Sequence, residues 1–130
     1  MLGIESVVLE NRTEEYVIAR VRAGVLEQGV VDVFRSAGLA GRLDEEGIVH
    51  HGIELRWGGR GHRLALSELT GGRTITIYGQ NRVVEDRGAA RRRAGGALLY
   101  EAEGVSLHDL DTDRPVIRYR HEGRDETLEC

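Results

Sequence analysis

Pairs of glycines divide this chain into short periodic segments, and this division is the strongest constraint on its fold. The sequence has 18 glycines and a single proline among 130 residues. Gly58-Gly59, Gly71-Gly72 and Gly95-Gly96 each stand between two periodic segments. Because glycine adopts positive φ without steric cost, such pairs are typical of turns. The turns leave a series of short strands and helices.

Most of these segments have the pattern of strands. The β-branched run Ile4–Glu10 is typical of a strand buried on both faces of a parallel sheet. The alternation over Ile48–Trp57 predicts one half-buried strand, which the Gly58-Gly59 turn pairs with Arg60–Leu66 in an antiparallel hairpin. Further strands are expected over residues 74–78, 97–100, 102–110, 116–121 and 126–130, the last three as an antiparallel meander.

Helices are expected at three places. The apolar spacing over Val25–Ala37 predicts a helix that ends at Gly38. Residues 39–46 are expected to form a second short helix, and residues 80–94 a third with Asn81 as its N-cap. Residues 11–19 are expected to be a polar loop or short turn. The predicted fold class is therefore mixed α/β, in one domain over residues 1–130, with crossover helices, an inserted hairpin and a meander.

Composition limits the classes of partner and compartment. The formal net charge is −4, the hydrophobic content is 40%, and every one of the 18 basic residues is arginine. This acidic balance favours neither nucleic acid nor an anionic membrane. The single cysteine, Cys130, excludes an intrachain disulfide and favours a reducing cytoplasm. The five histidines show no spacing typical of a metal site.

The stretch Arg20-Val-Arg-Ala-Gly-Val-Leu-Glu-Gln-Gly29 carries the strongest chemical signal. In an extended segment Arg20 and Arg22 point the same way, and a glycine and an expected helix follow them. Guanidinium groups beside a helix N-terminus are suited to bind an anion. The alternative is an ordinary solvated loop.

The chain resembles the para-hydroxybenzoate hydroxylase family of flavin monooxygenases, also called 4-hydroxybenzoate 3-monooxygenases. The resemblance rests on the Arg20–Gly29 stretch and on further motifs in the same order along the chain. They are Val7-Val-Leu-Glu10, Tyr16, Ile48-Val-His50, Gly71-Gly-Arg-Thr-Ile-Thr-Ile-Tyr-Gly-Gln80 and Leu107-His-Asp-Leu110. The resemblance implies a partial Rossmann-like FAD-binding domain that lacks the family's first strand, Gly-x-Gly-x-x-Gly turn and helix.

The resemblance assigns a group of residues to FAD. Glu10 matches the acid that binds the adenosine ribose, and Arg22 matches the arginine at the pyrophosphate. Arg20 matches a neighbour associated with the pyridine nucleotide, and Gln80 a glutamine near the ribityl and pyrophosphate. Ala23, Gly24, Val25 and Leu26 match the backbone along the isoalloxazine ring. Without the resemblance, each of these residues is an ordinary surface or helix-entry residue.

The resemblance also assigns residues to the nicotinamide nucleotide and to proton transfer. Asn11, Arg12 and Tyr16 match the loop that selects NADPH or NADH, and the acidic Glu14-Glu15 pair leaves that choice open. His50 matches the outer histidine of a proton relay from the substrate phenol, for which a near-neutral pKa is apt. The alternative for His50 is an exposed strand histidine.

These assignments lead to an expected function and one rival. The complete enzyme would be a homodimer that uses FAD, NADPH or NADH, and O2 to hydroxylate 4-hydroxybenzoate to 3,4-dihydroxybenzoate. We expect this chain alone to be inactive and to bind FAD poorly. The rival is a non-catalytic remnant or interaction module that needs a complementing partner.

Overall fold

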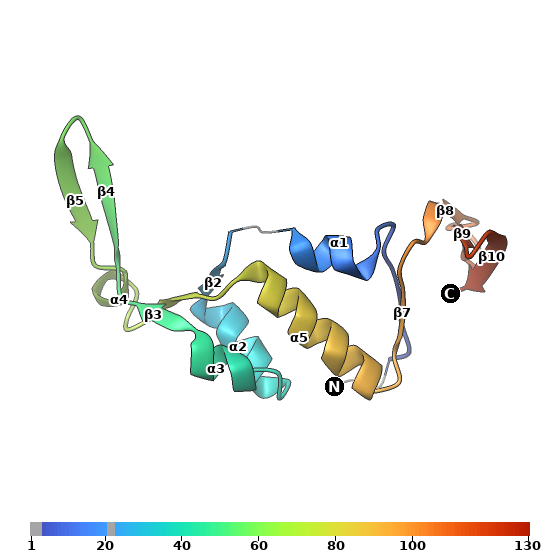
Figure 1. The fold of residues 1–130 in the computed structure, drawn as a ribbon, viewed down its shortest axis with the longest axis horizontal. Coiled ribbons are helices and arrows are strands. Elements are labelled where there is room, and N and C mark those ends of the chain that lie inside the picture. Colours follow the sequence, from blue (N-terminus) through green and yellow to red (C-terminus); the bar gives the residue numbers. More distant parts are fainter. Residues whose placement is uncertain (1–3, 21–22) are drawn as a thin grey trace. The chain divides into compact units, whose positions relative to one another are not determined.

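The computed structural model describes residues 4–20 and 23–130. Their contacts divide them into two compact units (Figure 1). The first unit contains residues 23–87, and the second contains residues 4–20 and 88–130.

A three-stranded antiparallel sheet is the centre of the first unit. Its order is β2 (Val25–Glu27), β6 (Ile75–Ile77) and β3 (Ile48–His50), with β6 in the middle. Val25 and Ile48 both pair with Ile77. The sheet therefore aligns the start of β2 with the end of β6, which precedes Gln80.

Helices α2 (Gln28–Ser36), α3 (Gly41–Glu46) and the start of α5 (Gln80–Arg93) build the core of this unit. Gly38, at φ +69°, ends α2 in the left-handed conformation that glycine favours. The core residues come from both helices and strands, since each element buries one face. They are Val31, Phe34, Ala40, Leu43, Tyr78 and Val83, with Leu26 and Leu39 packed against them.

A hairpin and a short helix are inserted between β3 and β6. Strands β4 (Ile53–Trp57) and β5 (Arg60–Leu64) pair across Gly58-Gly59, and α4 (Leu66–Leu69) follows (Figure 1). All residues of β4 are exposed. The hairpin therefore adds nothing to the core of the first unit.

The second unit begins with two parallel strands, β1 (Val7–Leu9) and β7 (Ala97–Leu99). Helix α1 (Glu14–Ala19) follows β1, and the side chain of Thr13 caps it. The Arg91 guanidinium, near the end of α5, donates to the Ala97 carbonyl at 2.9 Å and to the Ser6 carbonyl. These bonds hold the last turn of α5 to both strands.

The meander completes the second unit. Strands β8 (Glu103–His108), β9 (Val116–His121) and β10 (Arg124–Glu129) pair as consecutive antiparallel neighbours. A bulge interrupts β8 between Glu103 and Ser106, where Gly104 has φ +61°. Tyr119 of the central strand is buried.

The largest correction concerns residues 25–37. Val25–Glu27 is a strand, and the helix begins only at Gln28. The backbone of β2 pairs with β6. This long-range pairing outweighs the helical spacing of Val25 and Leu26, because two apolar residues are too few to determine helix or strand. Helix α2 buries the face that carries Val31 and Phe34, whereas Val33 is 62% exposed.

Two further expectations about elements are wrong. Residues 11–19 contain helix α1, because Thr13 accepts a hydrogen bond from the Tyr16 amide and starts the helix. Ile48–Trp57 is two strands in different sheets, because the chain breaks at His51-Gly52. A Cβ on Gly52 would clash with the Leu64 carbonyl oxygen, so this break needs glycine.

Smaller differences affect burial and one cap. Strand β1 is parallel as predicted, but Val7 and Val8 are 41% and 42% exposed, so neither is buried. Helix α5 begins at Gln80, one residue before the predicted cap Asn81. The mixed α/β class, the Gly38 and Gly47 helix ends, the hairpin and the meander are confirmed.

Candidate functional site

Glu10 lies at the carboxyl end of β1. Its amide donates to the Leu99 carbonyl at 2.9 Å, and its carbonyl accepts from the Ala102 amide at 2.9 Å. Its Oε1 accepts from the Arg12 amide at 2.9 Å. The side chain is thus fixed at the end of a parallel strand pair, and a carboxylate in that position can accept hydrogen bonds from ribose hydroxyls.

The loop after Glu10 brings together Arg12, Tyr16 and Arg20. The Arg12 guanidinium carbon lies 5.3 Å from the centroid of the Tyr16 ring. The Arg20 Nη1 donates to the Tyr16 hydroxyl at 3.5 Å. Asn11 is exposed in the turn between Glu10 and Arg12. Two guanidinium groups on one exposed phenol form a cationic surface that can meet a phosphate.

Acidic side chains lie on the same helix. Glu14 accepts from the Arg92 Nη1 at 2.6 Å, which neutralises much of its charge. Glu15, in the first turn of α1, is exposed. The surface around Tyr16 therefore carries both signs of charge.

In the first unit the structure brings Gly24 against the turn before Gln80. The Tyr78 amide donates to the Gly24 carbonyl at 2.7 Å. A Cβ on Gly24 would lie 2.6 Å from the Tyr78 oxygen and 2.9 Å from the Gly79 Cα. Only a glycine permits this approach of two backbones. Ala23 is exposed, Val25 and Leu26 begin β2, and Arg22 lies outside the described residues.

Gln80 is the first residue of the 14-residue helix α5. The Val83 amide donates to the Gly79 carbonyl at 3.2 Å, which closes the first turn. The other amides of this turn have no carbonyl partner within the helix, so they and the half-buried Gln80 side chain form a polar end. Such an end suits an anion or a polar cofactor chain.

His50 lies at the end of β3, where it pairs with Ile75 of β6. Its side chain is exposed in a shallow cavity of about 350 Å³ formed where β3 continues into β4. Seven residues line this cavity: Val49, His50, His51, Gly52, Ile53, Glu54 and Arg63.

A polar cluster around Tyr78 was not predicted from the sequence. The Tyr78 hydroxyl donates to Asp86 Oδ2 at 2.5 Å and accepts from Arg42 Nε at 3.0 Å. Arg42 Nη2 donates to Glu85 Oε2 at 2.7 Å. Burial and the bond to Asp86 raise the Tyr78 pKa, whereas the bond from Arg42 lowers the Glu85 pKa. Arg42 and Tyr78 are 36 positions apart in the sequence, so no local pattern signals this contact.

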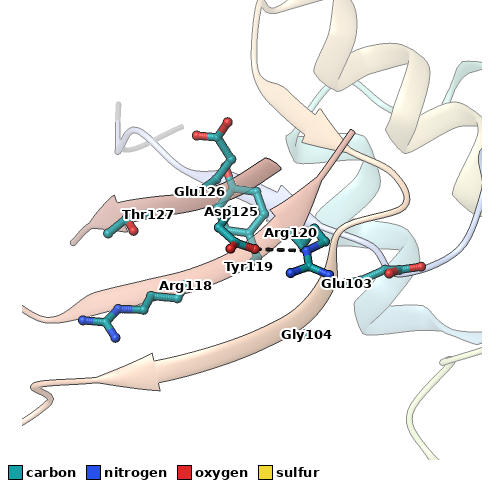
Figure 2. A pocket seen from close by; sticks show the side chains of 8 residues that line it. All are labelled: Glu103, Gly104, Arg118, Tyr119, Arg120, Asp125, Glu126 and Thr127. Atoms are coloured by element: carbon teal, nitrogen blue, oxygen red, sulfur yellow. Dashed lines mark hydrogen bonds and ion pairs between the residues drawn. The ribbon is translucent and has the colours of Figure 1, made fainter. Parts of the chain in front are cut away.

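A separate cavity of about 400 Å³ lies on the meander (Figure 2). Arg118, Arg120, Glu103 and Asp125 give it both signs of charge, and Arg120 Nε donates to Asp125 Oδ1 at 3.0 Å. None of its lining residues belongs to the predicted FAD site. The cavity includes Glu103 and Gly104 of the β8 bulge, and no residue of it has been assigned a chemical role.

Residues 4–20 and 23–130 contain neither a metal-binding group of side chains nor a helix that could cross a membrane. Within these residues, no three or more His, Cys, Asp and Glu side chains come together in a group that could hold a metal ion. The helices described there are all too short or too polar to cross a membrane.

Comparison with known proteins decides the family. A family model described as "FAD binding domain" matches residues 1–130. The chain belongs to the FAD-binding domain family. It is also 41% identical over 128 residues to p-hydroxybenzoate hydroxylase from Acinetobacter baylyi (strain ATCC 33305 / BD413 / ADP1). That alignment covers 98% of this chain and 31% of the relative, so the chain spans about a third of the enzyme it matches.

Solved structures confirm the fold of this family member. The flavin-dependent halogenase CmlS superposes with a TM-score of 0.75 at 18% identity, over 98% of this chain and 24% of CmlS. The p-nitrophenol 4-monooxygenase PnpA from Pseudomonas putida DLL-E4 gives 0.74 at 16%, over 98% of this chain and 32% of PnpA. At these identities the likeness concerns the fold alone.

The residues present fit FAD, the cofactor of this family. Glu10 offers a fixed carboxylate for a ribose, and the polar end of α5 offers amides and the Gln80 side chain. The missing Cβ of Gly24 lets its backbone pack against Tyr78 and Gly79, which brings residues 23–26 beside the turn before Gln80. The family resemblance found in the sequence is thereby confirmed, while the role of each residue stays a prediction.

Proposed function

We propose that this chain is the FAD-binding segment of a flavin-dependent 4-hydroxybenzoate 3-monooxygenase. The observation that carries the proposal is 41% identity to p-hydroxybenzoate hydroxylase across 98% of the chain. When bound, FAD would supply the redox chemistry: it takes electrons from NADPH or NADH and uses O2 to hydroxylate the aromatic ring. The complete enzyme would be a homodimer.

In this proposal the assigned residues bind different parts of FAD. Glu10 accepts hydrogen bonds from the adenosine ribose. Gln80 and the first amides of α5 bind the polar chain of FAD, and residues 23–26 lie along the flavin ring. Arg20 and Arg22 contribute positive charge for the pyrophosphate and the pyridine nucleotide.

His50 would carry a proton in the same enzyme. Loss of the phenol proton makes the substrate ring more nucleophilic, and a solvent-exposed imidazole can pass that proton to water. The exposed position of His50 at the end of β3 is compatible with this outer role. A structural role for His50 would instead leave the pH profile of hydroxylation unchanged after His50→Gln.

The cationic surface of Arg12, Tyr16 and Arg20 would meet the nicotinamide nucleotide. Stacked and hydrogen-bonded guanidinium groups suit the 2′-phosphate of NADPH, whereas exposed Glu15 beside them opposes it. The proposal therefore keeps both NADPH and NADH as co-substrates. Glu15→Gln should raise kcat/KM for NADPH relative to kcat/KM for NADH.

A chimera tests the proposal. These 130 residues replace the matching segment of the A. baylyi enzyme, and NADPH and NADH oxidation is followed with and without 4-hydroxybenzoate. We expect FAD-dependent oxidation that the substrate stimulates, with 3,4-dihydroxybenzoate as product. A folded chimera that takes up FAD yet hydroxylates no aromatic acid would contradict the assigned reaction.

The second candidate is a non-catalytic module that needs a complementing partner. It is favoured by the two-stranded sheet of β1 and β7, because Val7 and Val8 are exposed and two strands alone are marginally stable. A partner that supplies a further parallel strand with a Gly-x-Gly-x-x-Gly turn would cover them. Co-expression with such a segment should give a stable complex, and an unbound monomer would count against this candidate.

A further inference from the structure

The side chain of Tyr78 joins three elements of the first unit. Tyr78 is only 4% exposed, and its hydroxyl bonds to Arg42 of α3 and Asp86 of α5. The residue itself directly follows β6. A buried hydroxyl with both a donor and an acceptor partner has one preferred position, so these bonds fix the ring and the backbone that carries it.

Arg42 extends this connection along α5. Its Nη2 donates to Glu85 at 2.7 Å, and its Nε lies 3.4 Å from Asp86 Oδ1. Arg82 Nη1 donates to the same Glu85 oxygen at 3.2 Å. The charges are compensated, and the planar guanidinium fork sets a defined distance between α3 and the first turns of α5.

The backbone of Tyr78 faces the predicted flavin residues. Its amide bonds to Gly24, and the Gly79 Cα lies 2.9 Å from the position that a Cβ on Gly24 would take. Gln80 follows directly. A shift of the backbone at Tyr78 would therefore change the position of Gln80 relative to Gly24.

We propose that Arg42, Tyr78 and Asp86 are positioning residues for FAD, which set the Gly79-Gln80 turn against Gly24. We call these three residues the tyrosine clamp. The inference rests on the proposed function and deepens it, because it names residues that act on the cofactor site without touching the cofactor. A packing role alone would stabilise the unit without changing how the folded protein binds flavin.

Tyr78→Phe tests the clamp with least disturbance, since it removes the hydroxyl and keeps the buried ring. The variant removes both hydrogen bonds of the hydroxyl, each to a charged group. In the chimera we expect FAD to bind about tenfold more weakly because the turn is then held less firmly. The visible circular dichroism of the bound flavin should also change. Arg42→Gln removes the guanidinium group that donates to the Tyr78 hydroxyl, and this variant should also weaken FAD binding.

Arg35→Gln is the matched control. Arg35 donates to Asp44 Oδ1 from Nε at 3.0 Å and from Nη2 at 2.6 Å, so the variant also removes guanidinium bonds between helices of the first unit. This pair is exposed and joins α2 to α3. The control should leave FAD affinity and the flavin spectrum unchanged.

A measurement without cofactor tests whether the clamp holds the turn separately from whether the chain binds FAD. In the 130-residue chain, Tyr78→Phe should accelerate hydrogen exchange of the Tyr78 amide, which bonds to Gly24, more than that of the Val31 amide. Equal acceleration at both amides, or FAD affinity unchanged in the folded Tyr78→Phe chimera, overturns the clamp. If the unmodified chimera takes up no FAD, the proposed function fails, whereas the exchange result still decides whether the clamp holds the turn.

Discussion

Gly24 is the residue on which the predicted flavin site depends most directly. Its surroundings are backbone atoms of Tyr78 and Gly79, which cannot move aside as a flexible side chain does. The glycine is therefore needed for packing whether or not a flavin ring lies beside it.

Gly24→Ala should destabilise the first unit. The added Cβ would meet the Tyr78 oxygen at 2.6 Å, so the strand must shift or the hydrogen bond to Tyr78 must lengthen. We expect the free energy of unfolding to fall by about 1–3 kcal/mol, the usual cost of overpacking. Urea denaturation of the chain measures this loss.

Gly29→Ala is the control for this substitution. Gly29 lies in α2, and a Cβ there would have no atom within 4 Å. Alanine should raise the free energy of unfolding by up to about 1 kcal/mol because of its helix propensity. If Gly24→Ala raised the free energy of unfolding as Gly29→Ala does, the close approach at Gly24 would have no energetic importance.

Glu85 should make stability depend on pH on the acid side. The hydrogen bond from Arg42 lowers the Glu85 pKa below its ordinary value of 4.5. A lowered pKa contributes stability that is present above 4.5 and lost as the pH falls through the lowered value. Denaturation midpoints measured from neutral pH into this acid range should fall less steeply for Glu85→Gln than for the unmodified chain.

Glu45→Gln is the comparison for the acid-side effect, because Glu45 is an exposed carboxylate on α3. This variant should keep the full acid-side loss of the unmodified chain. Parallel curves for the unmodified chain and Glu85→Gln would show that the Arg42–Glu85 pair is solvated in solution.

Among the elements, α1 has the clearest local cause. Thr13 Oγ1 accepts from the Tyr16 amide at 3.2 Å, and Glu14 and Glu15 stand in the first turn, where the helix dipole favours acids. These are helix signals in the sequence, yet a six-residue helix is too short for apolar periodicity to reveal. The prediction of a loop over residues 11–19 was wrong for that reason.

Thr13→Ala should unfold α1 locally. Loss of an N-cap costs about 0.5–2 kcal/mol, and this helix has no buried residue to offset it. We expect faster amide exchange over residues 16–20, while Thr13→Ser, which keeps the capping oxygen, preserves protection. Unchanged exchange in Thr13→Ala would mean that Tyr16 and Arg20 are held by other contacts.

Other elements show what local patterns can and cannot predict. The hairpin and meander follow from alternation and glycine turns close in the sequence, and both were predicted. Strand β2 depends on β6, about 50 residues further along the chain, and the break at Gly52 depends on the Leu64 carbonyl. Such long-range contacts are invisible to periodicity, so helix and strand were confused there.

The candidate site was predictable mainly through family resemblance. Spacing alone left an anion site or an ordinary solvated loop at Arg20 and Arg22, whereas the ribose, flavin and proton roles came from matched motifs. The structure adds the contacts of Glu10, the surface around Tyr16 and the approach of Gly24 to Gly79. The tyrosine clamp needed the structure, because its members are separated by many residues.

Large apolar side chains are exposed on several of the described elements. They include Val7 and Val8 on β1, Ile48 and Val49 on β3, and Leu55 and Trp57 on the hairpin. Exposed apolar surface of this extent favours association. We expect reversible self-association whose extent rises with concentration in light scattering, with enhanced fluorescence of a hydrophobic dye. A strictly monomeric chain that binds no dye would show that these surfaces are covered in solution.

FAD uptake by the chimera tests the central claim most directly. The chimera is purified, stripped of flavin, and titrated with FAD while bound flavin is followed by absorbance and fluorescence. We predict saturable uptake of one FAD per chain, weakened in Glu10→Gln because the ribose loses its carboxylate acceptor. A folded chimera that takes up no FAD, beside an A. baylyi enzyme that does so under the same conditions, would contradict the account.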